Sequence, residues 1–243
     1  MFIYIKSRCA IMELDEEPHA LNLVLNSLRR LHEGERLRVM FDIDDTVADT
    51  SRVVLEEMGM EVSFRDKAFY KPEIKLEDYL EVYYKVWKER PTKIASNLSY
   101  ESARKLMEKT ELGFISARKR TGKAGLLKWL EHNYRGLNIP ITIVTPEPYN
   151  MHGFHKLKQN LHILVDDSPS VAESMSNGYA SGRSLLLVDR WEESVARRNH
   201  ANTAVVPNSE SAAKYILKAV ELHAHEIQNK RAAPQETRDT SAF

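Results

Sequence analysis

The chain has 243 residues, with 35 basic and 35 acidic side chains, so its formal net charge is zero. This balance excludes the overall basic surface typical of nucleic-acid-binding proteins, although a local basic patch stays open. The single cysteine, Cys9, excludes an internal disulfide, and no segment approaches the roughly 18 apolar residues that a membrane-spanning helix requires.

The first element that the sequence predicts is a helix over residues 14–32. Its apolar side chains recur at helical spacing: Leu21, Val24, Leu25, Leu28 and Leu31. A short apolar run follows at residues 37–43 and stops at acidic residues, which predicts a strand. Residues 1–12 lack the long apolar stretch of a signal peptide, so we expect a cytoplasmic protein.

Residues 48–110 have a different character from the rest of the chain. Three helical patterns occur there, near 49–58, 76–90 and 99–109. The segment is rich in aromatic side chains: Tyr70, Tyr79, Tyr83, Tyr84 and Trp87. These rings either pack a small helical bundle or contact a substrate, and the sequence leaves both interpretations open.

After residue 111, strand and helix patterns alternate. The predicted strands are 112–116, 141–145, 161–165, 184–188 and 203–206. The predicted helices are 122–134, 151–158, 169–176, 191–198 and 209–228. This alternation predicts an α/β fold in which right-handed crossovers build a parallel sheet covered on both faces. The polar residues 230–243 carry no core pattern, and we expect them to be disordered.

Chemically active side chains follow several of these strands. They are Asp42, Asp44, Asp45 and Thr46 after the first strand, Ser116 and Arg118 after the second, Lys156 and Lys158 beyond the third, and Asp166, Asp167 and Ser168 after the fourth. Because ligands bind at the carboxyl ends of parallel strands, we expect these groups to converge on one rim of the sheet.

Such a cluster has a definite chemistry. Crowded carboxylates repel one another, and a hard cation with oxygen ligands, such as Mg²⁺, relieves that repulsion. Basic side chains nearby balance the charge of a phosphate. One carboxylate can attack phosphorus, and a second, two residues away, can protonate the leaving oxygen and then activate water. The sequence therefore favours phosphoryl transfer at this rim.

Three segments resemble motifs of the haloacid dehalogenase (HAD) superfamily. VMFDIDDTV at residues 39–47 is similar to the first motif, DxDxTV/L; FISAR at 114–118 resembles the second, and ILVDDSP at 163–169 the fourth. Their order and spacing agree over roughly residues 37–190. The resemblance implies a three-layer, Rossmann-like core at residues 1–47 and 111–229, with a small α-helical cap at 48–110 inserted after the first strand.

The resemblance also implies roles for individual residues. Asp42 would be the nucleophile and a metal ligand, and Asp44 the general acid and base, with its main-chain carbonyl on the Mg²⁺. Asp167 would be the direct metal ligand of the aspartate pair, with Asp166 supporting it. Ser116 would bind the phosphate and Arg118 could reach it; of Lys156 and Lys158, spacing favours Lys156 as the phosphate-site lysine.

Asp44 narrows the expected activity, because dehalogenases of this superfamily lack an aspartate there. We therefore expect a Mg²⁺-dependent phosphomonoesterase with a small phosphorylated substrate. The helical cap resembles that of 5′(3′)-deoxyribonucleotidases, which suggests a nucleoside monophosphate, with Tyr79, Tyr83 or Trp87 stacking on the base. A phosphatase acting on nucleic-acid ends and a non-catalytic binding protein stay open as alternatives. The sequence indicates no membrane partner and gives no oligomeric state.

Overall fold

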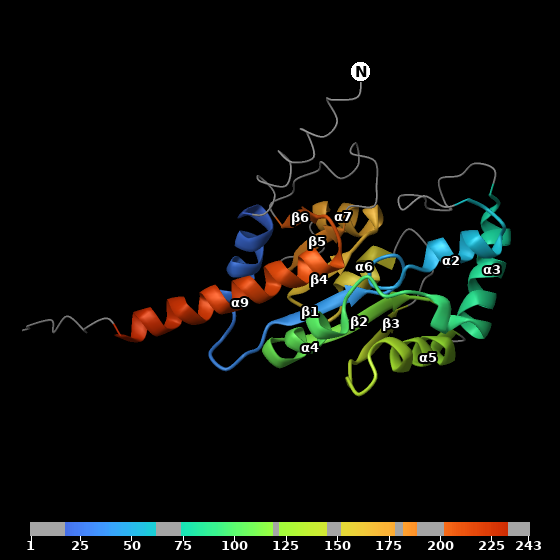
Figure 1. The fold of residues 1–243 in the computed structure, drawn as a ribbon. Coiled ribbons are helices and arrows are strands. Elements are labelled where there is room, and N and C mark those ends of the chain that lie inside the picture. The colour runs from blue at the N-terminus through green and yellow to red at the C-terminus, as the bar shows by residue number, and fades with distance from the viewer. Residues whose placement is uncertain are drawn as a thin grey trace, which may run out of the picture.

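A central sheet with helices on both sides forms the protein in this computed structural model (Figure 1). The structure describes residues 18–61, 74–118, 122–144, 152–177, 182–188 and 202–232. Within these ranges the strands are β1 (Arg38–Asp42), β2 (Glu111–Ala117), β3 (Ile141–Val144), β4 (Ile163–Asp166), β5 (Ser184–Val188) and β6 (Thr203–Val206). Every neighbouring pair is parallel, and the order is β3-β2-β1-β4-β5-β6. The predicted α/β fold class is confirmed.

The helices cover the sheet as two layers. One face packs against residues 18–28, which are helical, and against α4 (Tyr100–Lys109), α5 (Lys123–Asn133) and α9 (Ser209–Ala232). The other face packs against α6 (His152–Leu157) and α7 (Pro169–Ser176). Strands β4, β5 and β6 are buried along their whole length, as expected for a parallel sheet that is covered on both sides.

The strand register places two acidic residues side by side. Phe41 of β1 pairs with Val165 of β4, so the next residue on each strand is an aspartate, Asp42 and Asp166. The chain leaves β1 toward β2 on one side, and β4 lies on the other side. The carboxyl ends of β1 and β4 therefore form the point where the strand order reverses, which is where open α/β sheets bind their ligands.

A helical insert connects β1 to β2. It contains α2 (Thr50–Glu57), α3 (Leu76–Glu89), the 3-10 helix η2 (Pro91–Lys93) and α4. In Figure 1, α2 and α3 lie together at one side of the sheet, whereas α4 runs beside α9. Glu210 at the start of α9 accepts hydrogen bonds from the Ser99 main-chain N–H, at 3.0 Å, and from the Ser102 hydroxyl. The division into core and cap at residues 48 and 110 stays a prediction.

The ends of two predicted elements differ from the structure. The N-terminal helix, predicted over 14–32, ends at residue 28, and residues 1–17 lie outside the described part. α9 continues to Ala232, so the expectation that residues 230–232 belong to a disordered tail is wrong. Its last turns are rich in residues with good helix propensity, which continue a helix without a core pattern. Residues 233–243 and the predicted helix 191–198 lie outside the described ranges. Among the described helices, none is both long and apolar enough to cross a membrane.

Candidate active site

A tight loop after β1 shapes the site. Asp45 adopts a left-handed backbone conformation, with φ of 63°, and its N–H donates to the Ala48 carbonyl at 2.8 Å. The Asp45 carboxylate accepts hydrogen bonds from the N–H and the hydroxyl of Ser51, at 2.8 and 2.5 Å. Asp49, directly before α2, makes no capping hydrogen bond with its side chain. Asp45 therefore satisfies a free N–H in the first turn of α2, which is a structural role.

The same loop is anchored by residues from distant parts of the chain. The main-chain carbonyl of Thr46 accepts a hydrogen bond from the Ser209 hydroxyl at 2.7 Å and from the Asn97 side-chain amide at 3.2 Å. Ser209 is the first residue of α9, and Asn97 belongs to the insert before α4. The loop that carries the first motif is therefore held in place by α9 and by the insert.

Lys156 links two carboxylates at the ends of neighbouring strands. Its Nζ lies 2.6 Å from Asp42 Oδ1 and 2.7 Å from Asp166 Oδ2, and all three side chains are buried. Gly153 allows α6 to approach α7 closely, because a Cβ there would lie 2.7 Å from the Ser170 carbonyl oxygen. Lys158, by contrast, is exposed, and its Nζ lies 4.2 Å from the centre of the Phe154 ring. Of the two candidate lysines, the structure brings Lys156 to the carboxylates.

Three buried carboxylates form a group that can hold a metal ion. Asp42, Asp166 and Asp167 each offer one oxygen, and these oxygens all lie within 4.8 Å of one another. The Ser168 N–H donates to Asp166 Oδ1 at 2.8 Å, and the Thr46 hydroxyl donates to Asp167 Oδ1 at 3.1 Å. An all-oxygen, negatively charged donor set fits a hard cation such as Mg²⁺.

Burial and charge act in opposite directions on this group. Burial raises the pKa of Asp42 to about 8; the Lys156 ammonium opposes the rise, and the carboxylates of Asp166 and Asp44 add to it. Burial lowers the pKa of Lys156, but Asp166 and Asp42 more than offset this, so its pKa lies above its ordinary value. The net charge of the cluster thus favours an additional cation.

Asp44 lies apart from this group and accepts hydrogen bonds at both oxygens. Oδ1 accepts from the Thr50 hydroxyl at 3.0 Å and from Trp87 Nε1 at 3.2 Å. Oδ2 accepts from the Tyr83 hydroxyl at 3.1 Å, from the Ser116 hydroxyl at 3.2 Å, and from the Arg118 guanidinium. In this structure Asp44 thus engages Ser116 and Arg118, the groups that the sequence predicted to bind phosphate.

Two of the four aromatic side chains of α3 are packed inside the protein, and Tyr83 and Tyr84 are partly buried. Tyr79 and Trp87 are buried, and the Tyr79 hydroxyl lies 2.9 Å from the Ser51 hydroxyl. The Trp87 ring packs edge-on against Trp129, with centroids 6.1 Å apart, and the Arg118 guanidinium lies 4.2 Å from its centre. Tyr79 and Trp87 therefore have no exposed ring on which a base could stack, and the packing interpretation describes them.

Sequence reasoning missed Thr50, Tyr83 and Trp87 as partners of Asp44. A buried indole N–H or phenol hydroxyl requires a hydrogen-bond acceptor, so a helix rich in Tyr and Trp predicts that polar acceptors lie close to it. Nothing in the sequence says which acceptor it is, because these donors and Asp44 meet only through the packing of the insert.

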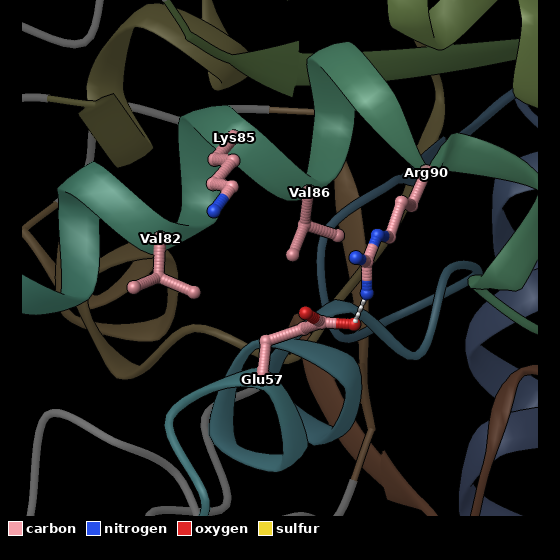
Figure 2. A pocket seen from close by; sticks show the side chains of 5 residues that line it. All are labelled: Glu57, Val82, Lys85, Val86 and Arg90. Atoms are coloured by element: carbon pink, nitrogen blue, oxygen red, sulfur yellow. Dashed lines mark hydrogen bonds and ion pairs between the residues drawn. The ribbon is translucent and has the colours of Figure 1, made fainter.

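A separate hollow lies between α2 and α3. It is lined by Glu57, Val82, Lys85, Val86 and Arg90. Figure 2 shows Arg90, the residue directly after α3, pointing toward Glu57 of α2, with which it forms an ion pair. None of the candidate site residues lines this hollow, so it is distinct from the carboxylate cluster.

Known proteins were compared with this chain by sequence and by structure. No protein-family model matches the sequence, and no curated protein matches it. A protein from Bacteroides vulgatus, assigned as a β-phosphoglucomutase, has a TM-score of 0.48 at 16% identity over 85% of this chain and 98% of its own. A hydrolase from Pseudomonas syringae has a TM-score of 0.45 at 14% identity over 79% and 99%.

A HAD-family hydrolase from Deinococcus radiodurans R1, described with bound phosphate and sodium, has a TM-score of 0.42 at 16% identity over 82% of this chain and 98% of its own. Likenesses at these TM-scores and identities decide neither the activity nor the substrate. The functional conclusion therefore rests on the motifs and on the geometry of the site.

Proposed function

We propose that the protein is a Mg²⁺-dependent phosphomonoesterase of the HAD superfamily, which forms an aspartyl-phosphate on Asp42. The observation that carries this proposal is the buried bridge of Lys156 between Asp42 and Asp166, beside Asp167, at the carboxyl ends of β1 and β4. A nucleophilic carboxylate, a cation for the phosphate and an acidic metal-binding group meet at the point where such sheets bind ligands.

Asp42, Asp166 and Asp167 would hold the metal through carboxylate oxygens, because they form the acidic group at the site. The motif resemblance adds the main-chain carbonyl of Asp44. Bound there, Mg²⁺ supplies positive charge that stabilises the transferring phosphoryl group. The Thr46 hydroxyl and the Ser168 N–H, which donate to Asp167 and Asp166, orient the two carboxylates.

The protein side chains carry out two chemical steps. In the first, an Asp42 oxygen attacks phosphorus, the bond from phosphorus to the leaving oxygen breaks, and Asp44 donates a proton to that oxygen. In the second, Asp44 takes a proton from water as the water oxygen attacks phosphorus. The bond between phosphorus and Asp42 then breaks, which releases phosphate and regenerates both carboxyl groups.

Binding of the substrate phosphate falls to three basic or hydroxyl groups. Lys156 balances its charge from the Asp42 side. Ser116 and Arg118 lie on the Asp44 side, where Arg118 Nε donates to the Ser116 hydroxyl at 2.7 Å. The substrate class that we propose is a small phosphomonoester, and nucleoside monophosphates are the first compounds to test.

The test is phosphate release by the purified protein from p-nitrophenyl phosphate and from a panel of nucleotides and sugar phosphates. We expect turnover that requires Mg²⁺, stops in EDTA, and disappears in Asp42→Asn and Lys156→Met. Lys158→Met is the matched control and should keep the activity, because Lys158 is exposed. Hydroxylamine should trap the acyl-phosphate as a hydroxamate on Asp42, detectable by mass spectrometry. Turnover that persists in Asp42→Asn would overturn the proposal.

A further inference from the structure

Two side chains of α3, Tyr83 and Trp87, hold Asp44 from the side of the insert. We propose that both are positioning residues, which keep the Asp44 carboxylate oriented for proton transfer to the leaving oxygen. This inference rests on the proposed function and deepens it. It assigns to the helical insert a part in the chemistry, in addition to any part in substrate selection.

The geometry of the two donors supports this role. Tyr83 and Trp87 are four residues apart on α3 and so project from the same side of the helix. The Trp87 indole donates to Oδ1 of Asp44 and the Tyr83 hydroxyl to Oδ2, at 3.2 and 3.1 Å. Because each oxygen has its own donor on one helix, rotation of the carboxylate breaks at least one hydrogen bond.

Trp87 itself is held rigidly. At Gly125 of α5, a Cβ would lie 1.8 Å from the Trp87 carbonyl oxygen, so the backbones of α3 and α5 are in direct contact. Trp87 is 1% exposed, and its ring packs edge-on against Trp129 of α5. The indole N–H is therefore fixed by the docking of α3 on α5, which is what precise orientation of a catalytic group requires.

Three further residues donate to Asp44: Thr50 of α2, and Ser116 and Arg118, which a phosphate would attract. Ser116 and Arg118 contact Asp44 Oδ2 in this structure. When they turn to a substrate phosphate, Asp44 loses both contacts. Tyr83 and Trp87 of α3 remain in place, together with Thr50 of α2, so they keep Asp44 oriented at the moment when it acts.

This role predicts a dependence on the leaving group. A good leaving group, such as p-nitrophenolate, departs with little help from an acid, whereas phenolate departs poorly without a proton. A residue that positions the acid should therefore matter more for phenyl phosphate than for p-nitrophenyl phosphate. A residue that only supports the fold should affect both esters equally.

The experiment measures kcat/KM for both esters, because this constant reports on steps up to phosphoenzyme formation. Asp44→Asn sets the full size of the selective loss, within the roughly 10²–10⁴-fold range typical of acid catalysis. We expect Tyr83→Phe and Trp87→Phe to lose about tenfold more on phenyl phosphate than on p-nitrophenyl phosphate. Tyr84→Phe is the matched control, since its ring lies beside Tyr83 with centroids 5.2 Å apart, and it should behave like wild type.

A double variant, Tyr83→Phe with Asp44→Asn, tests whether the effect passes through Asp44. We expect no selective loss beyond that of Asp44→Asn alone, because coupled residues are not additive. Equal losses on both esters in Tyr83→Phe, while Asp44→Asn is selective, would overturn the inference and leave the proposed function standing. Wild-type protein that hydrolyses neither ester would overturn the proposed function itself. Circular dichroism melts identify a variant that is misfolded. If Trp87→Phe is misfolded, the comparison of the two esters is made with Tyr83→Phe, which removes only one hydroxyl.

Discussion

Asp42 and Lys156 form a buried ion pair, with Oδ1 and Nζ 2.6 Å apart, at the carboxyl end of the first strand. The pair is part of a larger arrangement, because the same ammonium also neutralises Asp166 at 2.7 Å. A buried charge that loses its partner destabilises a fold more than the pair stabilised it. The site is therefore both the candidate catalytic centre and a point where the stability of the sheet depends on charge balance.

The first prediction concerns the removal of this cation. Lys156→Met removes the ammonium that pairs with Asp42 and Asp166, so we expect a loss of about 3–5 kcal/mol in the free energy of unfolding in EDTA. Saturating Mg²⁺ should recover part of the loss by binding the native state. Urea unfolding with and without Mg²⁺ measures both effects. The free energy of unfolding of Lys158→Met should stay within about 0.5 kcal/mol of wild type. A loss in Lys158→Met as large as that in Lys156→Met would contradict the prediction.

The second prediction concerns pH in the metal-free protein. The pKa of Asp42 is raised from 3.8 to about 8, chiefly by burial, so the native state binds more protons than the unfolded state between these values. The free energy of unfolding should therefore fall as pH rises through this window. Asp42→Asn removes the titrating group and should flatten that part of the profile, measured in EDTA. Identical profiles for the two proteins would refute the prediction.

The third prediction has the opposite sign and concerns His162. Its Nδ1 accepts the Arg38 N–H at 2.9 Å, and burial, followed by the charge of Arg38, lowers the pKa of His162 below 6.5. The unfolded state then binds more protons, so the stability that the neutral ring contributes is present above pH 6.5 and is lost as pH falls through the folded pKa. As pH is lowered from 6.5, the urea concentration at the midpoint of unfolding should decrease more steeply for wild type than for His162→Gln. A steeper fall in the variant would contradict this explanation.

The fourth prediction tests the contact between α3 and α5. Gly125→Ala places a methyl group against the Trp87 carbonyl, so the helices must separate. We expect a loss of about 1–3 kcal/mol in the free energy of unfolding, as for other overpacked positions. Leu127→Ala, at an exposed position of α5, is the control and should cost less. A thermal melt of Gly125→Ala that matches wild type would show that the contact adjusts freely.

Much of the fold could be predicted because its signals are local. Strands β5 and β6 have the bounds that their apolar runs predicted, and the acidic residues gather at the carboxyl ends of β1 and β4 as expected, with Asp42 and Asp166 as the last residues of these strands. The choice between Lys156 and Lys158 depended on helical phase, since two residues turn a helix by about 200° and only one of the pair can face the sheet. The sequence could not reveal that phase without the packing of α6 on α7.

The contacts of Asp44 could not be predicted, for a different reason. Tyr83 and Trp87 reach Asp44 because α3 packs directly on α5. This contact requires Gly125, where a side chain would clash with the backbone of Trp87, and the sequence alone does not show which two helices meet at this glycine. Asp45 is a similar case. It stands within an acidic motif, yet its left-handed conformation directs it to cap α2.

The anchoring of Thr46 by Ser209 has a consequence for protein synthesis. A ribosome makes Asp42, Asp44 and Lys156 long before it makes α9, whose first residue holds the carbonyl of Thr46. The nascent chain thus contains every proposed reacting group while the loop between β1 and α2 still lacks this support. Because chains fold progressively from the N-terminus, the arrangement of the site is completed only after α9 has emerged and docked. Docking of α9 is thus the closing step in the assembly of a site to which this helix contributes no proposed reacting group.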